Sequence, residues 1–139
     1  MSTPKSPGFT LLEMLTVLLI MSLIALLAYP SYMQYVYKTH RLDAMQSLFH
    51  YQGLWQSCRL HQVDALICLQ DIQLAPTQTL PSLQGHYDLT AELKASGITF
   101  YATAVNQAAD TTCFKFLLDN TGTYKSYTFD HQESTQRCI

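Results

Sequence analysis

The segment that decides the fold is GFTLLEMLTVLLIMSLIALLAY, which runs from Gly8 to Tyr29. From Phe9 to Tyr29 the only charged residue is Glu13. A helix of this length rises by about 31 Å, close to the hydrocarbon thickness of a bilayer. A carboxylate inside such a segment is costly in lipid and usually marks a function that involves a partner. We therefore predict a membrane-spanning helix at residues 9–29 that carries one functional acid.

The segment before this helix, residues 1–8, is short and polar and contains one cation, Lys5. In a secretory signal the small residue of the cleavage site follows the apolar run, whereas here Gly8 precedes it. Removal of residues 1–8 would therefore leave the apolar helix in the mature protein. Lys5 favours a cytoplasmic location for the N-terminal side. An uncleaved signal anchor has the same pattern and stays open as an alternative.

The chain continues for about 110 residues, which is enough for one small domain around a single sheet. Four cysteines lie in this part, at Cys58, Cys68, Cys113 and Cys138. An even number in a small domain behind a membrane segment predicts two disulfides and an oxidising compartment. We expect the pairs Cys58–Cys68 and Cys113–Cys138, the second of which holds a polar C-terminal segment. The other two pairings, and reduced thiols in a cytosolic domain, stay open.

Beyond Pro30 the pattern is that of an amphipathic helix over residues 30–60, followed by a connecting loop at 61–84 and a sheet at 85–139. One helix stripe, widened by Met45 and Leu54, should pack on the sheet: Tyr37, Arg41, Ala44, Leu48, Tyr51, Trp55 and Cys58. The loop contains residues suited to a turn or two of helix at 63–74. Four strands are predicted, at 86–92, 98–105, 112–118 and 122–129, with a hairpin turn at 119–122. The fold class is therefore α+β, with a long N-terminal helix on a four-stranded antiparallel meander.

The N-terminal residues resemble those of type IV prepilins. The resemblance rests on Gly8-Phe9-Thr10-Leu11-Leu12-Glu13, the apolar run, and the exit Ala28-Tyr29-Pro30-Ser31-Tyr32. It implies that a prepilin peptidase cleaves between Gly8 and Phe9, and that the new Phe9 amine is methylated. It also implies a bacterial inner-membrane protein with a cytoplasmic N-terminus and a periplasmic domain, later assembled into a helical surface pilus. Pro30 then marks a kink or a locally melted stretch.

A physical role for Glu13 follows from this resemblance. Cleavage creates a cation at the Phe9 amine, and Glu13 of one subunit can neutralise that amine on a neighbour when the apolar helices bundle. A misaligned helix would leave a buried charge unpaired, so the pair sets the register of assembly. The alternative is a protonated acid without a role. The implied partners are other major and minor pilins, the prepilin peptidase and the inner-membrane assembly platform.

The C-terminal part resembles PilE-type minor pilins more loosely, through the strand with Cys113, the Thr121-Gly122 hairpin and Cys138. Ile139 stands where many relatives end in an aromatic residue, and the Cys58/Cys68 pair is additional. Both are departures that concern the subfamily.

The sequence gives only weak indications of metal binding or catalysis. Cys58, His61 and Cys68 are spaced closely enough to share a zinc ion, but oxidation of the cysteines is favoured. Asp119 and Asn120 suit a calcium loop, although a turn is the simpler interpretation. The glycines are scattered and no catalytic constellation is present, so we expect no enzyme, cofactor or metal.

Three functions are consistent with the sequence. The first is a structural subunit, a minor pilin of a type IV pilus that supports adhesion, twitching motility or DNA uptake. The second is a type II secretion pseudopilin, which the cysteines disfavour. The third is a competence pilin that binds DNA, with cations near the disulfide and tyrosines for stacking: Lys115, Lys125, Arg137, Tyr124 and Tyr127. From His61 onward four cations face eight anions, so the net charge of −4 predicts weak DNA binding at most.

Overall fold

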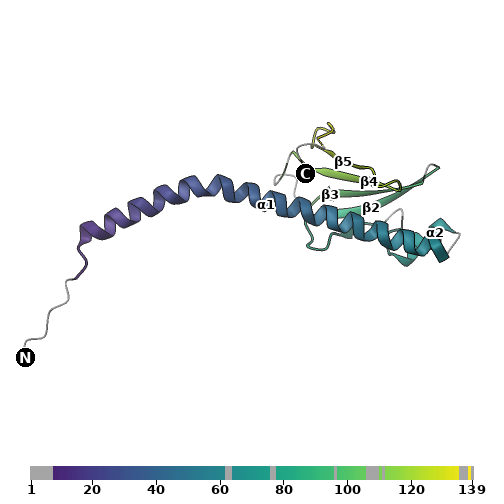
Figure 1. The fold of residues 1–139 in the computed structure, drawn as a ribbon, viewed down its shortest axis with the longest axis horizontal. Helices are drawn as coiled ribbons and strands as arrows, with labels where there is room; N and C mark the ends of the chain where they lie inside the picture. The colour runs from purple at the N-terminus through teal and green to yellow at the C-terminus, as the bar shows by residue number, and fades with distance from the viewer. Residues whose placement is uncertain are drawn as a thin grey trace, which may run out of the picture. The chain divides into compact units, whose positions relative to one another are not determined.

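The computed structural model describes residues 8–61, 64–75, 78–95, 97–105, 110, 112–134 and 138. The chain divides into two compact units, Met1–Val36 and Tyr37–Ile139. Helix α1, Leu11–His61, contributes residues to both units, and its N-terminal part is the purple end in Figure 1. Its apolar stretch has a mean hydropathy of 2.6, is unburied, and is long enough to cross a membrane. This agrees with the predicted membrane helix.

The start of α1 has a local cause that the sequence interpretation missed. The side-chain oxygen of Thr10 accepts a hydrogen bond from the backbone N–H of Glu13, at 3.3 Å. The order Thr-x-x-Glu is the pattern of a capping box, so the spacing alone was a usable signal. Further along, α1 continues through Pro30 without interruption. Of the two alternatives expected at Pro30, a kink or a locally melted stretch, the second is absent here, because a proline removes one N–H donor while the turns on both sides stay helical.

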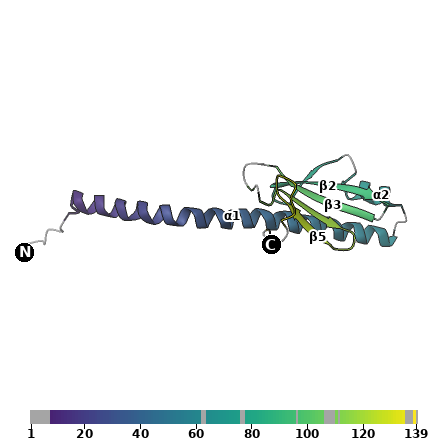
Figure 2. The same cartoon turned by 90° about the horizontal axis from the view of Figure 1, so that it is seen from above.

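A five-stranded antiparallel sheet forms the second unit, in the order β1-β2-β3-β4-β5. Its strands are β1 Leu80–Pro81, β2 Tyr87–Lys94, β3 Gly97–Ala104, β4 Lys115–Asp119 and β5 Tyr124–Tyr127. Each pairs with the next along the chain, so the predicted meander is confirmed. Figures 1 and 2 show this sheet lying along the second half of α1. The predicted count of four was wrong, because Leu80 and Pro81 add a short edge strand inside the expected loop.

The two C-terminal strands are shorter than predicted. Strand β4 begins at Lys115, since the backbone N–H groups of Thr112 and Cys113 donate to the Asp110 carboxylate instead of a ladder. Strand β5 ends at Tyr127, because Thr128 and Gln132 close a turn. The hairpin between these strands is as expected. The Asp119 carboxylate accepts from the N–H groups of Thr121 and Thr123, both at 2.8 Å, and Gly122 has φ 84°.

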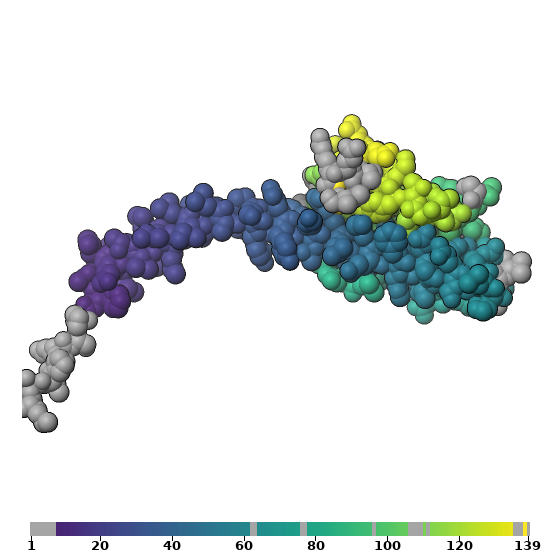
Figure 3. All heavy atoms as spheres, in the orientation of Figure 1, coloured from purple at the N-terminus to yellow at the C-terminus, as the bar shows by residue number. Residues whose placement is uncertain are grey.

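The core of the second unit lies between α1 and one face of the sheet. Ala44, Leu48 and Trp55 of the predicted stripe are buried there, against strand residues such as Phe100 and Phe116. Figure 3 shows the atoms of this part of α1 packed against those of the sheet. Leu54, expected to widen the stripe, is 40% exposed, so that part of the prediction was wrong. Three polar side chains share the buried face instead: Asp43, Ser47 and Gln52.

The connecting loop contains helix α2, Ala65–Asp71, within the segment predicted to form a turn or two of helix. Asp64 caps it by accepting from the Leu66 N–H, at 2.9 Å. Cys68 and Leu69 of this helix are buried in the core. The disulfide Cys58–Cys68 joins the end of α1 to α2, with the two Cα atoms 5.7 Å apart.

Candidate functional site

The sheet presents a second face, opposite the core, that carries charged and aromatic side chains. We call this the outer face. The strand register places on it Asp88, Thr90, Glu92, Lys94, Thr99, Tyr101, Thr103, Lys115, Leu117, Lys125 and Tyr127. Side chains alternate between the two faces of a strand, so every second residue of β2–β5 is directed here. A hollow of about 680 Å³ on this side is lined by Leu66, Thr90, Ala91, Glu92, Leu93, Tyr101 and Lys115.

Tyr101 lies at the centre of a charged cluster on the outer face. Its hydroxyl donates to the Glu92 carboxylate at 2.9 Å and accepts from the Lys94 ammonium at 3.1 Å. The Lys94 nitrogen is also 3.0 Å from the Glu92 carboxylate. Lys115 places its ammonium 4.4 Å from the centre of the Tyr101 ring, a cation–π contact. One aromatic ring on β3 is therefore in contact with two cations and one acid from the two neighbouring strands.

The predicted tyrosine pair is split by the sheet. Tyr127 is on the outer face, in register with Lys115. Tyr124 is directed into the core, where its ring stacks on Phe116 at 5.8 Å. Burial raises the pKa of the Tyr124 phenol. Stacking of Tyr124 on bases, as expected from the sequence, was therefore wrong, because its position in β5 gives it the opposite face from Lys125.

The two expected lysines both lie on the outer face. Lys125 on β5 pairs with Glu133 of the C-terminal segment, with 3.3 Å between nitrogen and oxygen. Among the residues that the structure describes, Lys115 forms no ion pair. Arg137, the third expected cation, lies outside the described residues. Sequence reasoning missed Lys94 and Tyr101, whose proximity to Lys115 depends on the strand register.

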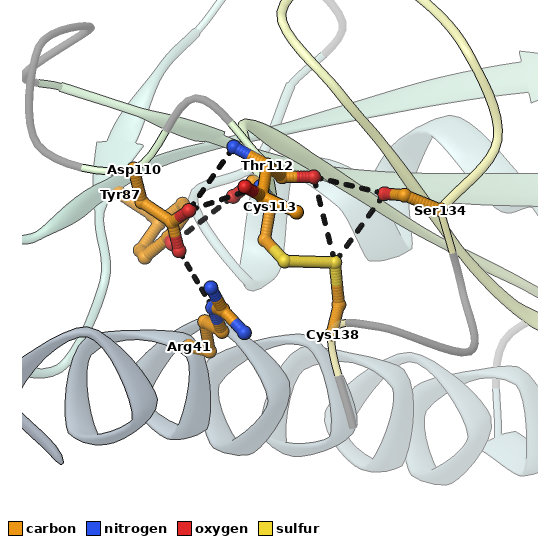
Figure 4. Close-up of a disulfide and its surroundings, with 7 residues drawn as sticks. All are labelled: Arg41, Tyr87, Asp110, Thr112, Cys113, Ser134 and Cys138. Atoms are coloured by element: carbon orange, nitrogen blue, oxygen red, sulfur yellow. Dashed lines mark hydrogen bonds and ion pairs between the residues drawn. A yellow bond between two sulfur atoms is a disulfide. The ribbon is translucent and has the colours of Figure 1, made fainter. Parts of the chain in front are cut away.

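The C-terminal segment is held by the predicted disulfide Cys113–Cys138, with Cα atoms 5.8 Å apart. Figure 4 shows this bridge above α1, with Ser134 beside it. The Ser134 hydroxyl donates to the carbonyl of Thr112 at 2.9 Å. The Ser134 N–H donates to the carbonyl of Ser126 at 2.8 Å, so the segment also pairs with the edge of β5. Glu133 is thereby brought next to Lys125.

An ion pair links this bridge to α1 (Figure 4). The Arg41 side chain donates to the Asp110 carboxylate at 2.6 Å, and the carboxylate is 8% exposed. The other oxygen of Asp110 accepts from the N–H groups of Thr112 and Cys113. The Tyr87 hydroxyl donates to the carbonyl of Cys113 at 3.4 Å. Arg41 was predicted on the packing stripe, but its partner was not foreseen.

A buried carboxylate on α1, Asp43, holds the turn between β1 and β2. It is 1% exposed and accepts from the Ser82 hydroxyl and from the N–H groups of Gln84 and His86. One helical turn later, the Ser47 hydroxyl accepts from the Leu83 N–H at 3.0 Å. Because a polar residue in an apolar stripe has no visible partner in sequence, this contact could not be predicted.

Two histidines lie beside that turn. The rings of His40 and His86 stack with their centroids 3.7 Å apart, in a cleft of about 210 Å³ that Asp110 also lines. Burial, followed by the charge of His86, lowers the pKa of His40, while Asp43 and Asp110 act in the opposite direction. Among the described residues no group of three or more His, Cys, Asp or Glu side chains is arranged to hold a metal ion.

The residues considered for zinc and calcium make different contacts in the structure. Cys58 and Cys68 are joined in a disulfide, which leaves neither sulfur as a thiolate ligand for zinc. The Asp119 carboxylate is directed to its own hairpin turn, and its hydrogen bonds, that from the Thr121 hydroxyl first, lower its pKa. The turn interpretation of residues 119–122 is therefore confirmed.

The predicted assembly residues belong to the N-terminal unit. Phe9 is 76% exposed, Glu13 is exposed, and so are the apolar side chains that follow them up to Leu27. The backbone N–H of Glu13 is capped by Thr10. Within the described part of a single chain, the Glu13 carboxylate forms no ion pair, so it is open to a group from outside that chain.

Two family models match the chain. Residues 4–29 match the prokaryotic N-terminal methylation motif. Residues 30–117 match a family described as type IV minor pilin ComP, DNA uptake sequence receptor. No curated protein and no solved structure matches the chain. The two matched ranges favour the minor-pilin and DNA-uptake hypotheses over a secretion pseudopilin.

The second match covers more than half of the chain and includes α1 beyond Pro30, both partners of the first disulfide and most of the sheet. The methylation motif and the apolar helix are those of a membrane-anchored pilin. With the pilin-like arrangement of a long helix on an antiparallel sheet, these findings agree: the chain is a type IV minor pilin and belongs to the ComP family of DNA uptake sequence receptors.

Proposed function

We propose that this minor pilin binds DNA for uptake and that the outer face of its sheet makes the contact. The observation that carries the proposal is the cluster of Lys94, Tyr101 and Lys115, continued by Lys125, on a face that the core does not use. The family description supports DNA as the ligand. Phosphates supply most of the affinity in protein–DNA complexes, and lysines on neighbouring strands suit a phosphate backbone.

Lys115 should make the strongest phosphate contact. Its ammonium rests on the Tyr101 ring and forms no ion pair among the described residues, so no acid has to be displaced. Lys125 should contribute less, because Glu133 neutralises part of its charge. Tyr127 is in register with Lys115 and offers an aromatic edge to the same ligand.

The test is DNA binding by the full chain in detergent micelles, with a 30-bp duplex at several salt concentrations. Lys115→Gln should weaken binding and reduce the slope of log K against log salt by about one, and Lys125→Gln should have the same effects to a smaller extent. Lys38→Gln is the matched control, since Lys38 is an exposed cation on α1. Binding that does not depend on salt, or an equal loss in the Lys38 variant, would refute the outer-face contact.

The N-terminal unit has a separate task in this proposal. A prepilin peptidase cleaves between Gly8 and Phe9, the Phe9 amine is methylated, and Glu13 neutralises the same amine of a neighbouring subunit. The match to the methylation motif and the exposed apolar helix support this order of events. Before assembly the chain crosses the inner membrane once, with residues 1–8 cytoplasmic and the domain from Tyr37 periplasmic, where the two disulfides form.

After assembly the subunit is part of a surface pilus, with other pilins and the inner-membrane platform as its partners. Mass spectrometry of the protein from its native cells tests the processing. We expect a chain that begins with methylated Phe9. Exported, filament-associated protein that retains residues 1–8 would contradict it.

A further inference from the structure

The outer face presents its lysines together with acids. Lys94 is 3.0 Å from the Glu92 carboxylate, and Lys125 is 3.3 Å from that of Glu133. In each pair the fold has brought the acid to its lysine, within β2 for the first and from the C-terminal segment for the second. Resting on the proposed function, we propose that Glu92 and Glu133 are specificity-determining residues, which pair with Lys94 and Lys125 in the free protein and thereby suppress binding to DNA of arbitrary sequence.

Glu92 is held by two neighbouring side chains. The Tyr101 hydroxyl donates to it at 2.9 Å and the Lys94 ammonium lies beside it. The hydrogen bonds from Lys94 and Tyr101, in that order, lower the pKa of Glu92, and the nearby charge of Lys115 acts in the same direction. Glu92 is therefore ionised wherever DNA would be bound, and it opposes both Lys94 and Lys115.

The consequence for binding follows from the polyelectrolyte character of DNA. Sequence-independent affinity comes from cations that neutralise phosphates and release counterions. A lysine already neutralised by a carboxylate releases fewer counterions, so the non-specific term falls. A duplex held in one register by base-edge and shape contacts places its phosphates at the lysines and displaces the carboxylates. The loss therefore falls mainly on DNA of arbitrary sequence, and the ratio of specific to non-specific affinity rises.

Both lysine–glutamate pairs are also exposed enough for a DNA phosphate to take the place of the carboxylate. The side chains of Lys94 and Glu92 are 46% and 56% exposed, and those of Lys125 and Glu133 are 41% and 52% exposed. Exposed ion pairs contribute little to stability, so a correctly positioned phosphate can replace the carboxylate. The acids thus weaken the binding of a duplex that makes no additional contacts, whereas a duplex held in register by such contacts displaces them at little cost.

The experiment compares two duplexes with the full chain in detergent micelles. One is a random-sequence 30-bp duplex, and the other is a duplex enriched by the wild-type protein from a random-sequence library. In the double variant Glu92→Gln, Glu133→Gln, we expect the Kd for the random duplex to fall about three- to tenfold and its salt slope to steepen by up to about two. The Kd for the enriched duplex should change less than about twofold, so selectivity falls.

The control is Asp88→Asn, Asp130→Asn, which changes the net charge equally. Asp88 is on the outer face and Asp130 is exposed near Glu133, and neither forms an ion pair within the described part of the chain. This variant should keep the wild-type selectivity. Addition of Lys94→Gln to Glu92→Gln should return the Kd for the random duplex toward that of the wild type, since the released cation is removed.

The role of these acids would be overturned by equal tightening on both duplexes, or by the same loss of selectivity in the aspartate control. If the wild-type protein enriches a duplex but the glutamine variant keeps the wild-type selectivity, the proposed function stands and only the role of the acids is refuted. Failure of the wild-type protein to enrich any duplex would refute the receptor function and this inference together. Trp55 fluorescence during thermal unfolding verifies that each variant is folded.

Discussion

The two units of this chain use apolar residues in opposite ways. In the N-terminal unit the side chains from Phe9 to Leu27 are exposed, whereas in the second unit those of the sheet are buried against α1. The second unit buries the apolar side chains of its core within one chain. The first can do so only in lipid or against other subunits. One unit is thus specified by its own contacts and the other by its surroundings.

The largest expected effect comes from a substitution that impairs assembly through the first unit and leaves the second unit unchanged. Glu13→Val removes the only carboxylate of the apolar segment, so the Phe9 amine of a neighbouring subunit would be buried unpaired. We expect incorporation into filaments to fall at least about tenfold. The amount of this pilin in sheared pili, relative to that in the membrane, measures it.

The second unit is the internal control for this variant. Trp55 fluorescence should report the wild-type unfolding midpoint in urea, because Glu13 belongs to the first unit and is not one of the core residues of the second. If the valine variant were incorporated into filaments at the wild-type level, Glu13 would not set the register of assembly.

The next largest effect is a loss of stability in the second unit, which leaves the first unit unchanged. Replacing Cys113 and Cys138 by serine opens a loop of 25 residues and should lower the free energy of unfolding by about 3.5 kcal/mol. The pair Cys58 and Cys68, separated by 10 residues, should cost about 2.7 kcal/mol. Urea unfolding followed at Trp55 measures both. A reversed order would mean that contacts of α2 outweigh loop length.

The difference between the units also explains what the sequence could predict. The membrane helix, the meander and the hairpin at Asp119 follow from periodicity and turn chemistry, which are local. Strand β1 was missed because two residues, one of them Pro81, show no alternation and belong to an edge. Glu92 and Lys94 are two residues apart, so alternation places both on one face, but the predicted strand stopped at residue 92. The acid beside Lys125 could not be predicted because its position depends on the path of the C-terminal segment.

The contacts of Asp43 are the clearest example of a feature that the sequence pattern could not predict. Asp43 occupies a buried position on α1, and its partners are donors of a turn that lies about forty residues further along the chain. Asp43→Ala leaves those donors without an acceptor and should cost about 2 to 3 kcal/mol, comparable to the shorter disulfide. Urea unfolding measures it, with Gln46→Ala on the exposed side of α1 as control. A cost below that of the control would show that the turn is held by its strand contacts alone.

The smallest effect concerns pH. The pKa of His40 in the folded protein is lowered, chiefly by burial and then by His86, although Asp43 and Asp110 oppose the shift. The unfolded chain therefore binds more protons, so the contribution to stability is complete above about pH 6.5 and is lost as the pH falls below it. His40 is only partly buried, so the melting temperature should drop by only about 2 °C between pH 7.5 and pH 5 because of this group. In His40→Gln that part of the drop should disappear, while Glu13→Val, which alters only the first unit, should retain it. An unchanged drop in the His40 variant would assign the acid sensitivity to another group of the second unit.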